Sequence, residues 1–262
     1  MVWLQHLKKV LTEGATTEVR GKRMVEIPQA TIKVDMRKPV VAVSERKLNY
    51  KFMAAEAYWI LSGDDSVAGI APWNAKIAEY SDDGVRFFGA YGPPIKEQMA
   101  YVVGKLKADP ASRQAGLTIW RQNPPETKDY PCTVAMFFSI RAGQLHAHVF
   151  MRSSDAWLGL PYDIFNFSCI AAYVLASLND GAATHDMLFL GNLYLTMANA
   201  HIYETDLWKA IRVVGQDHRS TVLPLDDMRM AGMLLPPQWT VKPEALMDGL
   251  RETRGRGLGA LQ

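Results

Sequence analysis

The amino-acid sequence has 262 residues and shows little of what marks disulfide-rich, membrane-spanning, secreted or nucleic-acid-binding proteins. Two cysteines are too few for a disulfide framework and favour a reducing compartment. No apolar run approaches the roughly 18 residues that a membrane span requires, and Met1–Val10 lacks the apolar run of a secretory signal. A net charge of +2 is too small for a nucleic-acid groove that acts through bulk charge. We therefore expect a cytoplasmic protein that binds neither membranes nor nucleic acid directly.

The composition is that of a globular chain. Hydrophobic residues make up 48% and charged residues 21%, which argues against wholesale disorder. Glycine and proline are near their average frequencies, and no internal repeat or linker-like block interrupts the apolar patterning. We therefore expect one continuous domain over residues 1–262, with a mobile tail at about 251–262.

Hydrophobic periodicity predicts a mixture of helices and strands, and therefore the α+β class. Helices are expected at Val2–Leu11, Asn49–Leu61, Ile95–Ala108, Phe165–Leu178 and Ile202–Val213. Strands are expected at Leu117–Trp120, Thr133–Ile140, Leu145–Met151 and Met187–Ala198, with a pair of strands inside Met24–Met36. The chain from Gly215 onward, rich in proline, is expected to be irregular.

Two residues suggest anion binding and nucleophilic chemistry. Cys132 opens an apolar strand, where it is either a small buried hydrophobe or a nucleophile at a loop-to-strand junction. Arg152 follows a later apolar strand and precedes Ser153. It is either a surface residue at a strand end or, with the serine hydroxyl, a grip for an anion such as phosphate.

Two carboxylates occur in strongly apolar helices. Glu56 interrupts the apolar face of Asn49–Leu61. It is either a snorkelling edge residue or, if buried, a group of raised pKa suited to proton transfer. Asp163 lies with Asn166 at the mouth of the helix at Phe165–Leu178, where it either caps the helix or requires a polar partner.

The histidines are weaker signals. His201 and Tyr203 fall on the same side of an extended segment, which also suits an ordinary half-buried surface. His146 and His148 share one face of their strand, but no cysteine or glutamate lies at ligand spacing. We therefore expect no metal site.

The order of these motifs along the chain is more informative than any one of them. Cys132 precedes Arg152 by 20 residues, and Arg152 precedes Asp163 by 11. The related motifs are LQHLKKVLTEG at 4–14, AAEAYWILSGD at 54–64, YGP at 91–93, DPASR at 109–113, PC at 131–132, RSSDAWLGLPYD at 152–163 and AHIY at 200–203. Over residues 2–210 the sequence resembles the thymidylate synthase family, which includes the pyrimidine-nucleotide hydroxymethylases. The block RSSDAWLGLPYD is the most specific of these motifs.

The resemblance implies a thymidylate synthase-like α+β fold, in which a large mixed sheet is packed with helices and a homodimer forms sheet against sheet. It also implies an enzyme that transfers a one-carbon unit from 5,10-methylenetetrahydrofolate, bound as co-substrate, to C5 of a pyrimidine nucleotide monophosphate. Attack of a thiolate on C6 of the base makes C5 nucleophilic enough to take the carbon.

The family's functional residues are carried over one by one. Cys132 matches the nucleophile, and Arg152 matches the arginine that binds the phosphate and lowers the pKa of the thiol. The remaining nucleotide positions match Ser153 and Arg20 at the phosphate, Arg113 donated across the dimer, His201 and Tyr203 at the sugar, and Asp155 in the same block. The catalytic positions match Glu56 near the folate and the base, Tyr91 in the removal of the C5 proton, and Asn199 where many synthases have aspartate. The folate positions match Trp73, Leu158 and Gly159 beside the ring and Arg46 near its tail.

Two positions depart from the family pattern. Gln114 occupies the place of a second arginine that reaches across the dimer, which leaves one phosphate contact and the sugar preference open. Thr133 occupies the place of the histidine that usually follows the nucleophile, and the sequence does not indicate the consequence.

Asp163 is the informative departure. Uracil-specific members have asparagine here, whose amide donates to O4 and accepts from N3–H. A carboxylate instead accepts from the N4 amino group of cytosine, and its charge favours a protonated N3. Asp163 thus resembles the deoxycytidylate hydroxymethylases of phages and the cytidylate hydroxymethylases of nucleoside-antibiotic pathways, in which water quenches the methylene at C5. The leading prediction is a dCMP 5-hydroxymethylase of nucleotide biosynthesis and DNA modification, which releases tetrahydrofolate.

Several alternatives stay open. Within the family they are a CMP hydroxymethylase, a dCMP 5-methyltransferase and a thymidylate synthase acting on dUMP, of which Asp163 disfavours the last. The choice between water and hydride depends on folate placement and solvent access. From another class, a catalytically idle member could bind nucleotide or RNA, but the presence of Cys132, Arg152, Glu56 and Tyr91 together argues against it. The gene could be cellular or phage-borne.

Overall fold

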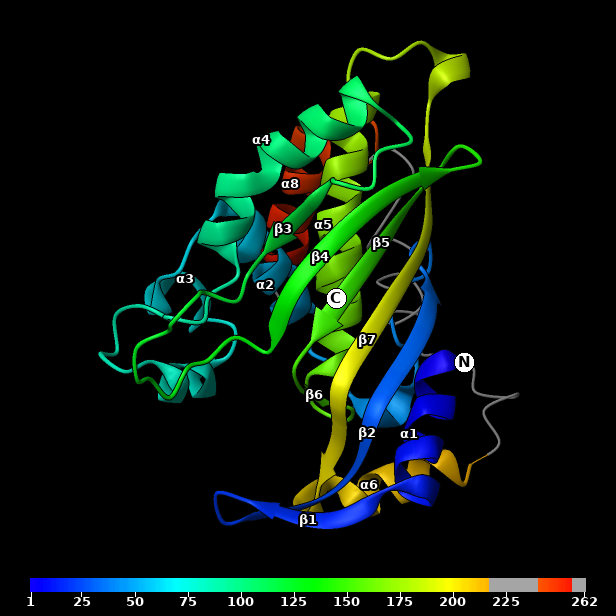
Figure 1. Cartoon of the computed structure of the whole chain (residues 1–262). Helices are drawn as coiled ribbons and strands as arrows, with labels where there is room; N and C mark the ends of the chain where they lie inside the picture. The colour runs from blue at the N-terminus through cyan, green and yellow to red at the C-terminus, as the bar shows by residue number, and fades with distance from the viewer. Residues whose placement is uncertain (217–239, 256–262) are drawn as a thin grey trace, which may run out of the picture.

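The computed structural model describes residues 1–216 and 240–255. Its centre is a sheet in the order β1–β2–β7–β5–β4–β3, with β6 paired to β7 outside this path, as Figure 1 shows. The strands are β1 Ala15–Val19, β2 Lys22–Asp35, β3 Gly116–Thr118, β4 Thr133–Arg141, β5 Gln144–Met151, β6 Ser154–Asp155 and β7 Phe189–Tyr203. The helices are α1 Val2–Glu13, α2 Tyr50–Ser62, α3 Val67–Ile70, α4 Gly92–Ala108, α5 Leu160–Asn179, α6 Glu204–Val214 and α8 Pro243–Gly255. Short 3-10 turns lie at 44–46, 75–80 and 184–186.

The sheet is mixed. Strands β2 and β7 pair antiparallel over most of their length, whereas β5 and β7 run parallel. Strands β4 and β5 form the hairpin expected around residues 141–144, and both central residues of its turn have positive φ, +49° at Ala142 and +72° at Gly143. This geometry is that of a type I′ turn, whose twist matches the twist of the flanking strands. The expected α+β fold, a large mixed sheet packed with helices, is confirmed.

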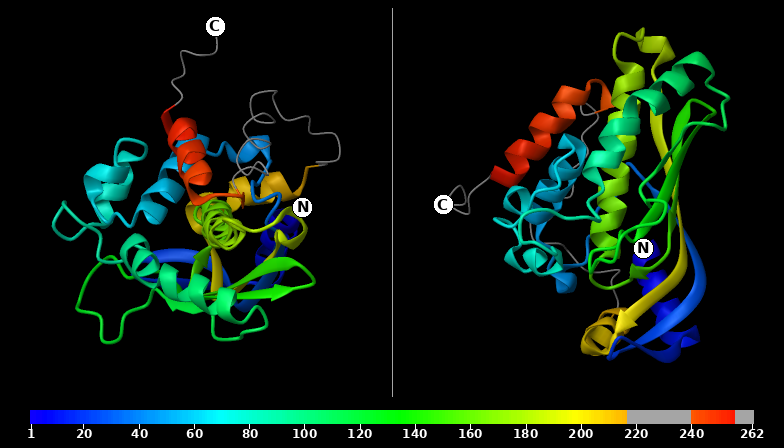
Figure 2. Two further views of the ribbon diagram at one scale, coloured as in Figure 1. Left: turned by 90° about the horizontal axis from the view of Figure 1, so that it is seen from above. Right: turned by 60° about the vertical axis from the view of Figure 1, so that its left-hand side comes forward.

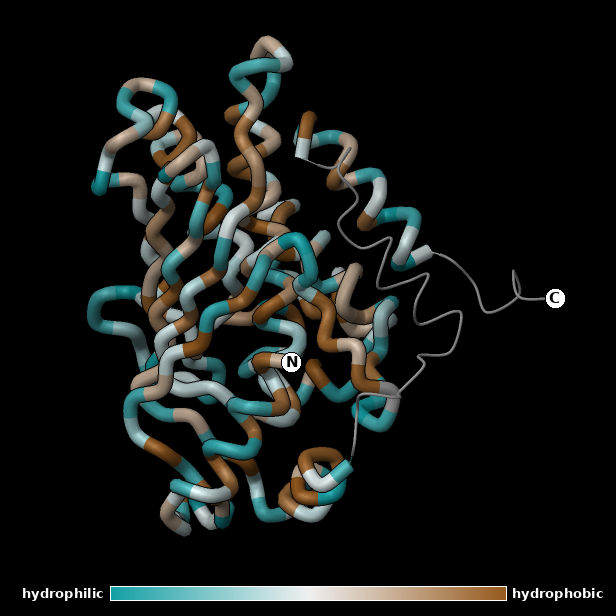
Figure 3. The backbone as a smooth tube through the Cα atoms, turned by 90° about the vertical axis from the view of Figure 1, so that its right-hand side faces the viewer, coloured by the Kyte–Doolittle hydropathy of each residue, from teal (hydrophilic) through white to brown (hydrophobic). Residues whose placement is uncertain are grey.

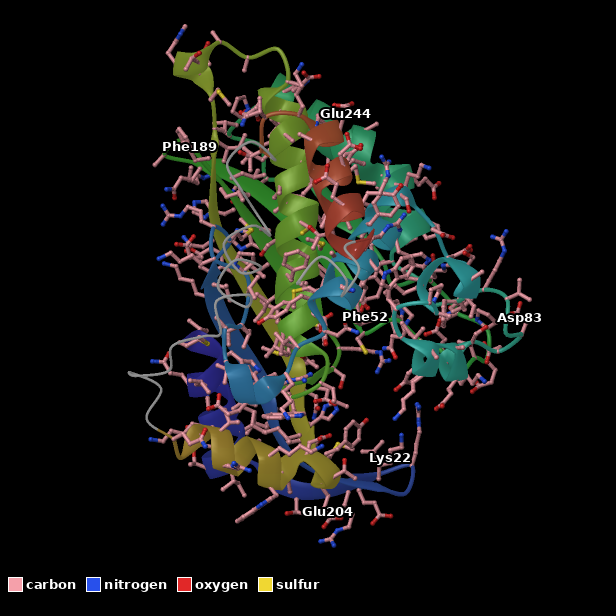
Figure 4. The ribbon with its side chains drawn as sticks, turned by 180° about the vertical axis from the view of Figure 1, so that it is seen from behind. Lys22, Phe52, Asp83, Phe189, Glu204 and Glu244 are labelled. Atoms are coloured by element: carbon pink, nitrogen blue, oxygen red, sulfur yellow. The ribbon has the colours of Figure 1, made fainter. Side chains whose placement is uncertain are left out.

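Helix α5 is the central element of the helical layer. It is buried on nearly all sides because almost every residue from Ile164 to Ala176 is apolar or small. Seen from behind, α5 and α8 run side by side over the inner face of the sheet (Figure 4), and α8 packs on both α2 and α5. The side view in Figure 2 shows the helices gathered on one side of the curved sheet.

The opposite face of the sheet is not covered by the described helices. Val134, Phe137 and Phe150 point from it with 36 to 46% of their surface exposed. Phe137 and Phe150 pack edge to face with their ring centroids 6.4 Å apart. A contiguous apolar patch of this kind marks an interaction surface more often than a solvated one.

Three predicted elements are corrected by the structure. Met24–Met36 contains no strand pair but lies largely within one long strand, β2, which is bent where Gln29 takes a φ of +48°. Strand β7 continues to Tyr203, so the following helix begins at Glu204 rather than Ile202. Extensive pairing with β2 outweighs the helical periodicity there.

The third correction concerns the end of the chain. Helix α8 occupies Pro243–Gly255, where irregular chain and a mobile tail were expected. Leu246 and Leu250 are fully buried one turn apart, and hydrophilic and hydrophobic residues alternate along this helix in Figure 3. The rest of the predicted irregular region and tail, residues 217–239 and 256–262, lies outside the described residues.

Candidate active site

Helix α2 positions Glu56. The side chain of Asn49 caps the helix by accepting from the Phe52 amide at 3.0 Å. The face that α2 turns inward is otherwise apolar, so Glu56 is a single carboxylate in a hydrophobic layer. Its Oε2 accepts a hydrogen bond from Asn166 Nδ2 at 2.7 Å. Burial raises the pKa of Glu56 to about 7, although the bond from Asn166 opposes the shift.

The first turn of α5 positions Asp163. Asp155 Oδ1 accepts from the amides of Trp157 and Leu158, both at 2.9 Å, and folds the chain into the turn that leads to the helix. Gly159 is the N-cap residue and no side chain caps the helix, so Asp163 is not a cap. Burial raises the pKa of Asp163 well above its usual value, and the charges of Glu56 and Asp155 add to the shift.

Glu56 and Asp163 line the same cavity, of about 160 Å³. The other polar side chains around it are Tyr91, Asp129 and Asn166, and its walls include Trp59 and Phe87. We call this space, lined by Glu56, Tyr91, Asp129, Asp163 and Asn166, the acid cavity. Three carboxyl groups around one small space in a low-dielectric setting favour the protonated forms.

Cys132 lies immediately before β4 and is half-buried. Its carbonyl oxygen accepts from the amide of Arg152 at 2.9 Å. The guanidinium of Arg152 in turn donates to the carbonyl oxygens of Pro131 and Tyr130, both at 2.9 Å. Arg152 therefore holds the backbone that presents the thiol. Burial raises the pKa of Cys132; Arg152 lowers it, in the direction that the resemblance implied, and Asp163 and Asp129 raise it further.

Tyr91 is held at the start of α4. Gly92, the next residue, lies so close to the backbone of Asp64 that a Cβ atom would come within 2.6 Å of its carbonyl oxygen. The ring of Tyr91 stacks on Phe167, and its hydroxyl oxygen accepts from Thr133 Oγ1 at 3.0 Å. Thr133, whose role the sequence left open, thus links the residue after the cysteine to the tyrosine. Burial raises the pKa of Tyr91 well above its usual value.

A second polar group lies where β5, β6 and β7 end. His201 Nδ1 lies 3.4 Å from Ser153 Oγ and 3.2 Å from Asn199 Oδ1, and Asn199 Nδ2 donates to Glu26 Oε2 at 2.6 Å. Asp155 pairs with His201 across β6 and β7. Burial lowers the pKa of His201, while Asp155 opposes the shift. We call Arg152, Ser153, Asp155, Asn199 and His201 the strand-end cluster.

Tyr203 and Arg20 extend this cluster toward solvent. The Tyr203 ring packs edge to face on His201 with centroids 4.9 Å apart. Arg20 lies in the turn between β1 and β2, where it and Gly21 both have positive φ. It is close enough to Tyr203 to oppose the rise in the pKa of that phenol. In Figure 4, where Lys22 marks the hairpin, the turn extends from the lower end of the sheet.

The residues expected beside folate lie around the neighbouring rim. Arg46 donates to the carbonyl oxygens of Trp157 (2.8 Å) and Leu158 (3.2 Å), and therefore supports the turn before Gly159. The indole of Trp73 donates to the carbonyl oxygen of Arg254 in α8 at 3.2 Å. The Arg254 guanidinium lies 3.8 Å from the ring centroid of Tyr58, and these three residues line a second cavity of about 270 Å³.

Arg113 is far from all of these groups within one chain. It lies in the loop before β3, two residues from Ala115, whose carbonyl oxygen accepts from Phe138. Cys132 is at the other end of β4. Roughly 20 Å of strand therefore separates it from Phe138, which contacts the loop that contains Arg113.

Sequence reasoning missed the parts played by Asn166, Asp129 and Thr133. Asn166 was visible one helical turn after Asp163, on the same face of α5. Asp129, which accepts from the Gly89 amide at 2.7 Å, carried no local signal.

Two absences concern only the described residues 1–216 and 240–255. No group of three or more histidine, cysteine, aspartate or glutamate side chains could hold a metal ion there. No helix in that part of the chain is long and apolar enough to cross a membrane.

Comparison with known proteins agrees with this geometry. The family model described as thymidylate synthase matches residues 1–228. The chain belongs to the thymidylate synthase family. The family resemblance noted in the sequence is thereby confirmed, and with it the expectation of a family of folate-dependent one-carbon transferases.

Individual relatives of the thymidylate synthase family are distant. A deoxyuridylate hydroxymethyltransferase of Bacillus phage SP01 is 29% identical over 230 residues, 78% of this chain and 57% of the relative. The thymidylate synthase of Brachyspira hyodysenteriae is 27% identical over 221 residues, covering 78% and 80% of the two chains. The thymidylate synthase of Enterobacteria phage T4 is 26% identical over 222 residues, covering 75% and 74%. The chain thus spans little more than half of the phage SP01 protein.

Proposed function

We propose that this protein is a hydroxymethylase that acts on C5 of a cytosine nucleotide, with dCMP as the favoured substrate and 5,10-methylenetetrahydrofolate as the carbon donor. One observation carries the choice of base: a carboxyl group, Asp163, lines the acid cavity beside Glu56, near Cys132. A cytosine offers an N4 amino donor and an unprotonated N3 to that group. The oxygens of the Asp163 carboxyl can accept from the N4 amino group, and a proton on that carboxyl, which its raised pKa favours, can be shared with N3.

The chain's residues divide the chemistry. The Cys132 thiolate adds to C6 of the base, helped by the charge of Arg152, and is released again after C5 has taken the carbon. Tyr91, beside both Asp163 and Cys132, takes part in removal of the C5 proton. Glu56, whose pKa lies at about 7, exchanges protons near the carbon donor and orders the attacking water. The strand-end cluster and Arg20 hold the phosphate and sugar.

The rim suits the proposed co-substrate. Trp73 and Tyr58 line the second cavity with Arg254, whose guanidinium lies over both rings, and Leu158 is 47% exposed beside the turn that Arg46 supports. The guanidinium of Arg254 in the second cavity is suited to a carboxylate tail. Bound there, methylenetetrahydrofolate would supply carbon at the oxidation level of formaldehyde.

A homodimer that packs sheet against sheet completes the proposal. The uncovered face of the sheet carries Val134, Phe137 and Phe150, and Arg113 cannot reach the site of its own chain. A second copy seated on that face would bury the apolar patch and bring its own Arg113 to the first copy's phosphate site.

The mass of the product distinguishes the proposed hydroxymethylation from methylation. The purified protein is incubated with methylenetetrahydrofolate and, separately, dCMP, CMP or dUMP. We expect dCMP to gain CH2O while tetrahydrofolate is released. A gain of CH2 with formation of dihydrofolate would show methylation instead. Conversion of dUMP in preference to both cytosine nucleotides would contradict the choice of base and favour the reaction named for the phage SP01 relative.

A further inference from the structure

The side-chain amide of Asn166 forms a hydrogen bond through its nitrogen but none through its oxygen among the described residues. The residue lies in α5, is 4% exposed and lines the acid cavity. Its Nδ2 donates to Glu56 Oε2 at 2.7 Å. Its Oδ1 is buried, and no donor within hydrogen-bond distance was found among the described residues. A buried acceptor without a donor destabilises the fold, so its presence in a residue that lines a cavity indicates a ligand group.

Another asparagine of the same helix shows what a structural amide looks like. Asn179 is 3% exposed, and its Nδ2 donates to the carbonyl oxygens of Leu188 (3.1 Å) and Thr240 (2.9 Å). Its Oδ1 accepts from the Leu188 amide at 2.9 Å. Asn179 is therefore saturated by protein groups, whereas Asn166 is not.

Glu56 determines which half of the Asn166 amide remains unused. The bond to Glu56 Oε2 uses the NH2 group of the amide. The carbonyl oxygen is then left without a donor in a residue that lines the acid cavity. Thr133 Oγ1 donates to Tyr91 and Asp129 accepts from Gly89, and among the described residues no donor lies within hydrogen-bond distance of Asn166 Oδ1.

We infer that Asn166 is a specificity-determining residue whose Oδ1 accepts a hydrogen bond from the exocyclic amino group of the cytosine base. That amino group carries two hydrogens. Asp163, one turn earlier on the same face of α5, takes the one beside N3, and Asn166 takes the one beside C5. The O4 atom of uracil has no hydrogen, and there it would meet the carbonyl oxygen of Asn166 as acceptor against acceptor. The inference rests on the proposed function.

A double-mutant cycle between protein and ligand tests the contact. The protein change is Asn166→Leu, which keeps approximate size and removes the acceptor. The ligand change replaces dCMP by the deoxyribonucleotide of 2-pyrimidinone, which lacks the amino group. Dissociation constants are measured without folate, so that no chemical step contributes. In the wild type we expect loss of the amino group to weaken binding by about 5- to 100-fold, and in Asn166→Leu by less than about threefold.

Asn179→Leu is the matched control, because it removes a buried amide from the same helix outside the cavity. It is expected to lower stability while leaving the ratio of the two dissociation constants as in the wild type. If Asn166→Leu does not fold, Asn166→Ser, which loses the reach of the amide, replaces it in the cycle.

The outcomes separate the two proposals. If the wild type binds dCMP better than dUMP but the cycle shows no coupling between Asn166 and the amino group, the inference about Asn166 is wrong and the proposed function stands. The same holds if Asn166→Leu weakens dCMP and 2-pyrimidinone nucleotide equally, which would indicate a bound water or a structural role. If the wild type prefers dUMP, the proposed function itself fails.

Discussion

The carboxyls of the acid cavity and the arginines beside the strand ends differ in their surroundings. In the cavity, Glu56 and Asp163 are enclosed among aromatic and aliphatic side chains, and burial raises the pKa of both carboxyls. At the strand ends, Arg152 is exposed and forms hydrogen bonds with backbone carbonyls, while Arg20 lies at the tip of a hairpin. A carboxyl in low dielectric takes up a proton, whereas an arginine keeps its charge in water at little cost.

The difference assigns separate tasks to the two regions. Proton transfer requires groups with a pKa near the working pH, and burial brings the Glu56 carboxyl into that range. Holding a phosphate requires permanent positive charge, and solvent access lets the nucleotide enter and leave. Cys132 experiences both regions, because Arg152 lowers its pKa and Asp163 raises it.

The largest expected effect is at Cys132. Cys132→Ser should lower kcat for the nucleotide by about 1,000-fold or more, because a serine hydroxyl is a poor nucleophile here without a neighbouring base. Steady-state kinetics measures the loss, and circular dichroism checks the fold. The control is Cys169→Ala in α5, a thiol fully buried away from the cavity, which should keep near wild-type activity. Undiminished activity of Cys132→Ser would rule out the covalent mechanism.

The next effect concerns the stability of the fold and arises in the acid cavity alone. The pKa of Glu56 is about 7 in the folded protein and 4.5 in its reference state, so the folded state binds the proton more tightly. Its contribution to stability is present below pH 4.5 and is lost as the pH rises through 7. Glu56→Gln removes that loss while keeping an acceptor for Asn166. We expect it to raise the free energy of unfolding by about 2–3 kcal/mol at pH 8 relative to its effect at pH 4.

Denaturant unfolding at the two pH values measures the stability change. The same variant should lose most of its activity, because glutamine transfers no proton. A variant with equal stabilisation at both pH values would show that Glu56 is not held in its protonated form by burial.

The third effect concerns the base specificity that we assign to Asp163. Asp163→Asn should lower kcat/KM for dCMP by about 10- to 100-fold and raise it for dUMP, since an amide donates to O4 and accepts from N3–H. The loss on cytosine should exceed the gain on uracil, because Asn166 and the rest of the cavity are unchanged. Competition between the two nucleotides in one reaction gives the ratio directly. If the ratio does not move, Asp163 does not read the base.

The smallest effect concerns Arg113 and the binding of the phosphate. Arg113→Ala should raise KM for the nucleotide by about tenfold with little change in kcat, because a solvent-screened contact to phosphate contributes mainly to binding. Mixing Arg113→Ala with Cys132→Ser tests whether sites are shared. Each hybrid dimer would contain one intact site, and with nucleotide well below its KM statistical mixing should give about a quarter of wild-type activity, more than either variant alone. Subunits that demonstrably exchange without restoring activity would contradict the shared site.

Sequence reasoning pointed to those candidate site residues that linear motifs carry. Cys132, Arg152 and Asp163 were singled out because they occur at characteristic separations in the chain, and helices α2, α4 and α5 because apolar residues recur along their whole length. Thr133 was noticed, but its bond to Tyr91 joins residues 42 positions apart, which no local pattern contains. Helix α8 was missed because proline-rich sequence precedes it and its apolar face is short.

By itself, the sequence determined the family, the α+β class and which groups are the candidates for the reaction, because residue types and their spacing are local properties of the chain. Only the tertiary structure decided the state of those groups. Enclosure among Trp59, Phe87 and their neighbours raises the pKa of Glu56, and its hydrogen bond orients the amide of Asn166 toward the cavity. Desolvation and hydrogen bonding depend on what surrounds an atom in space, and α2 and α5 meet only when the chain has folded.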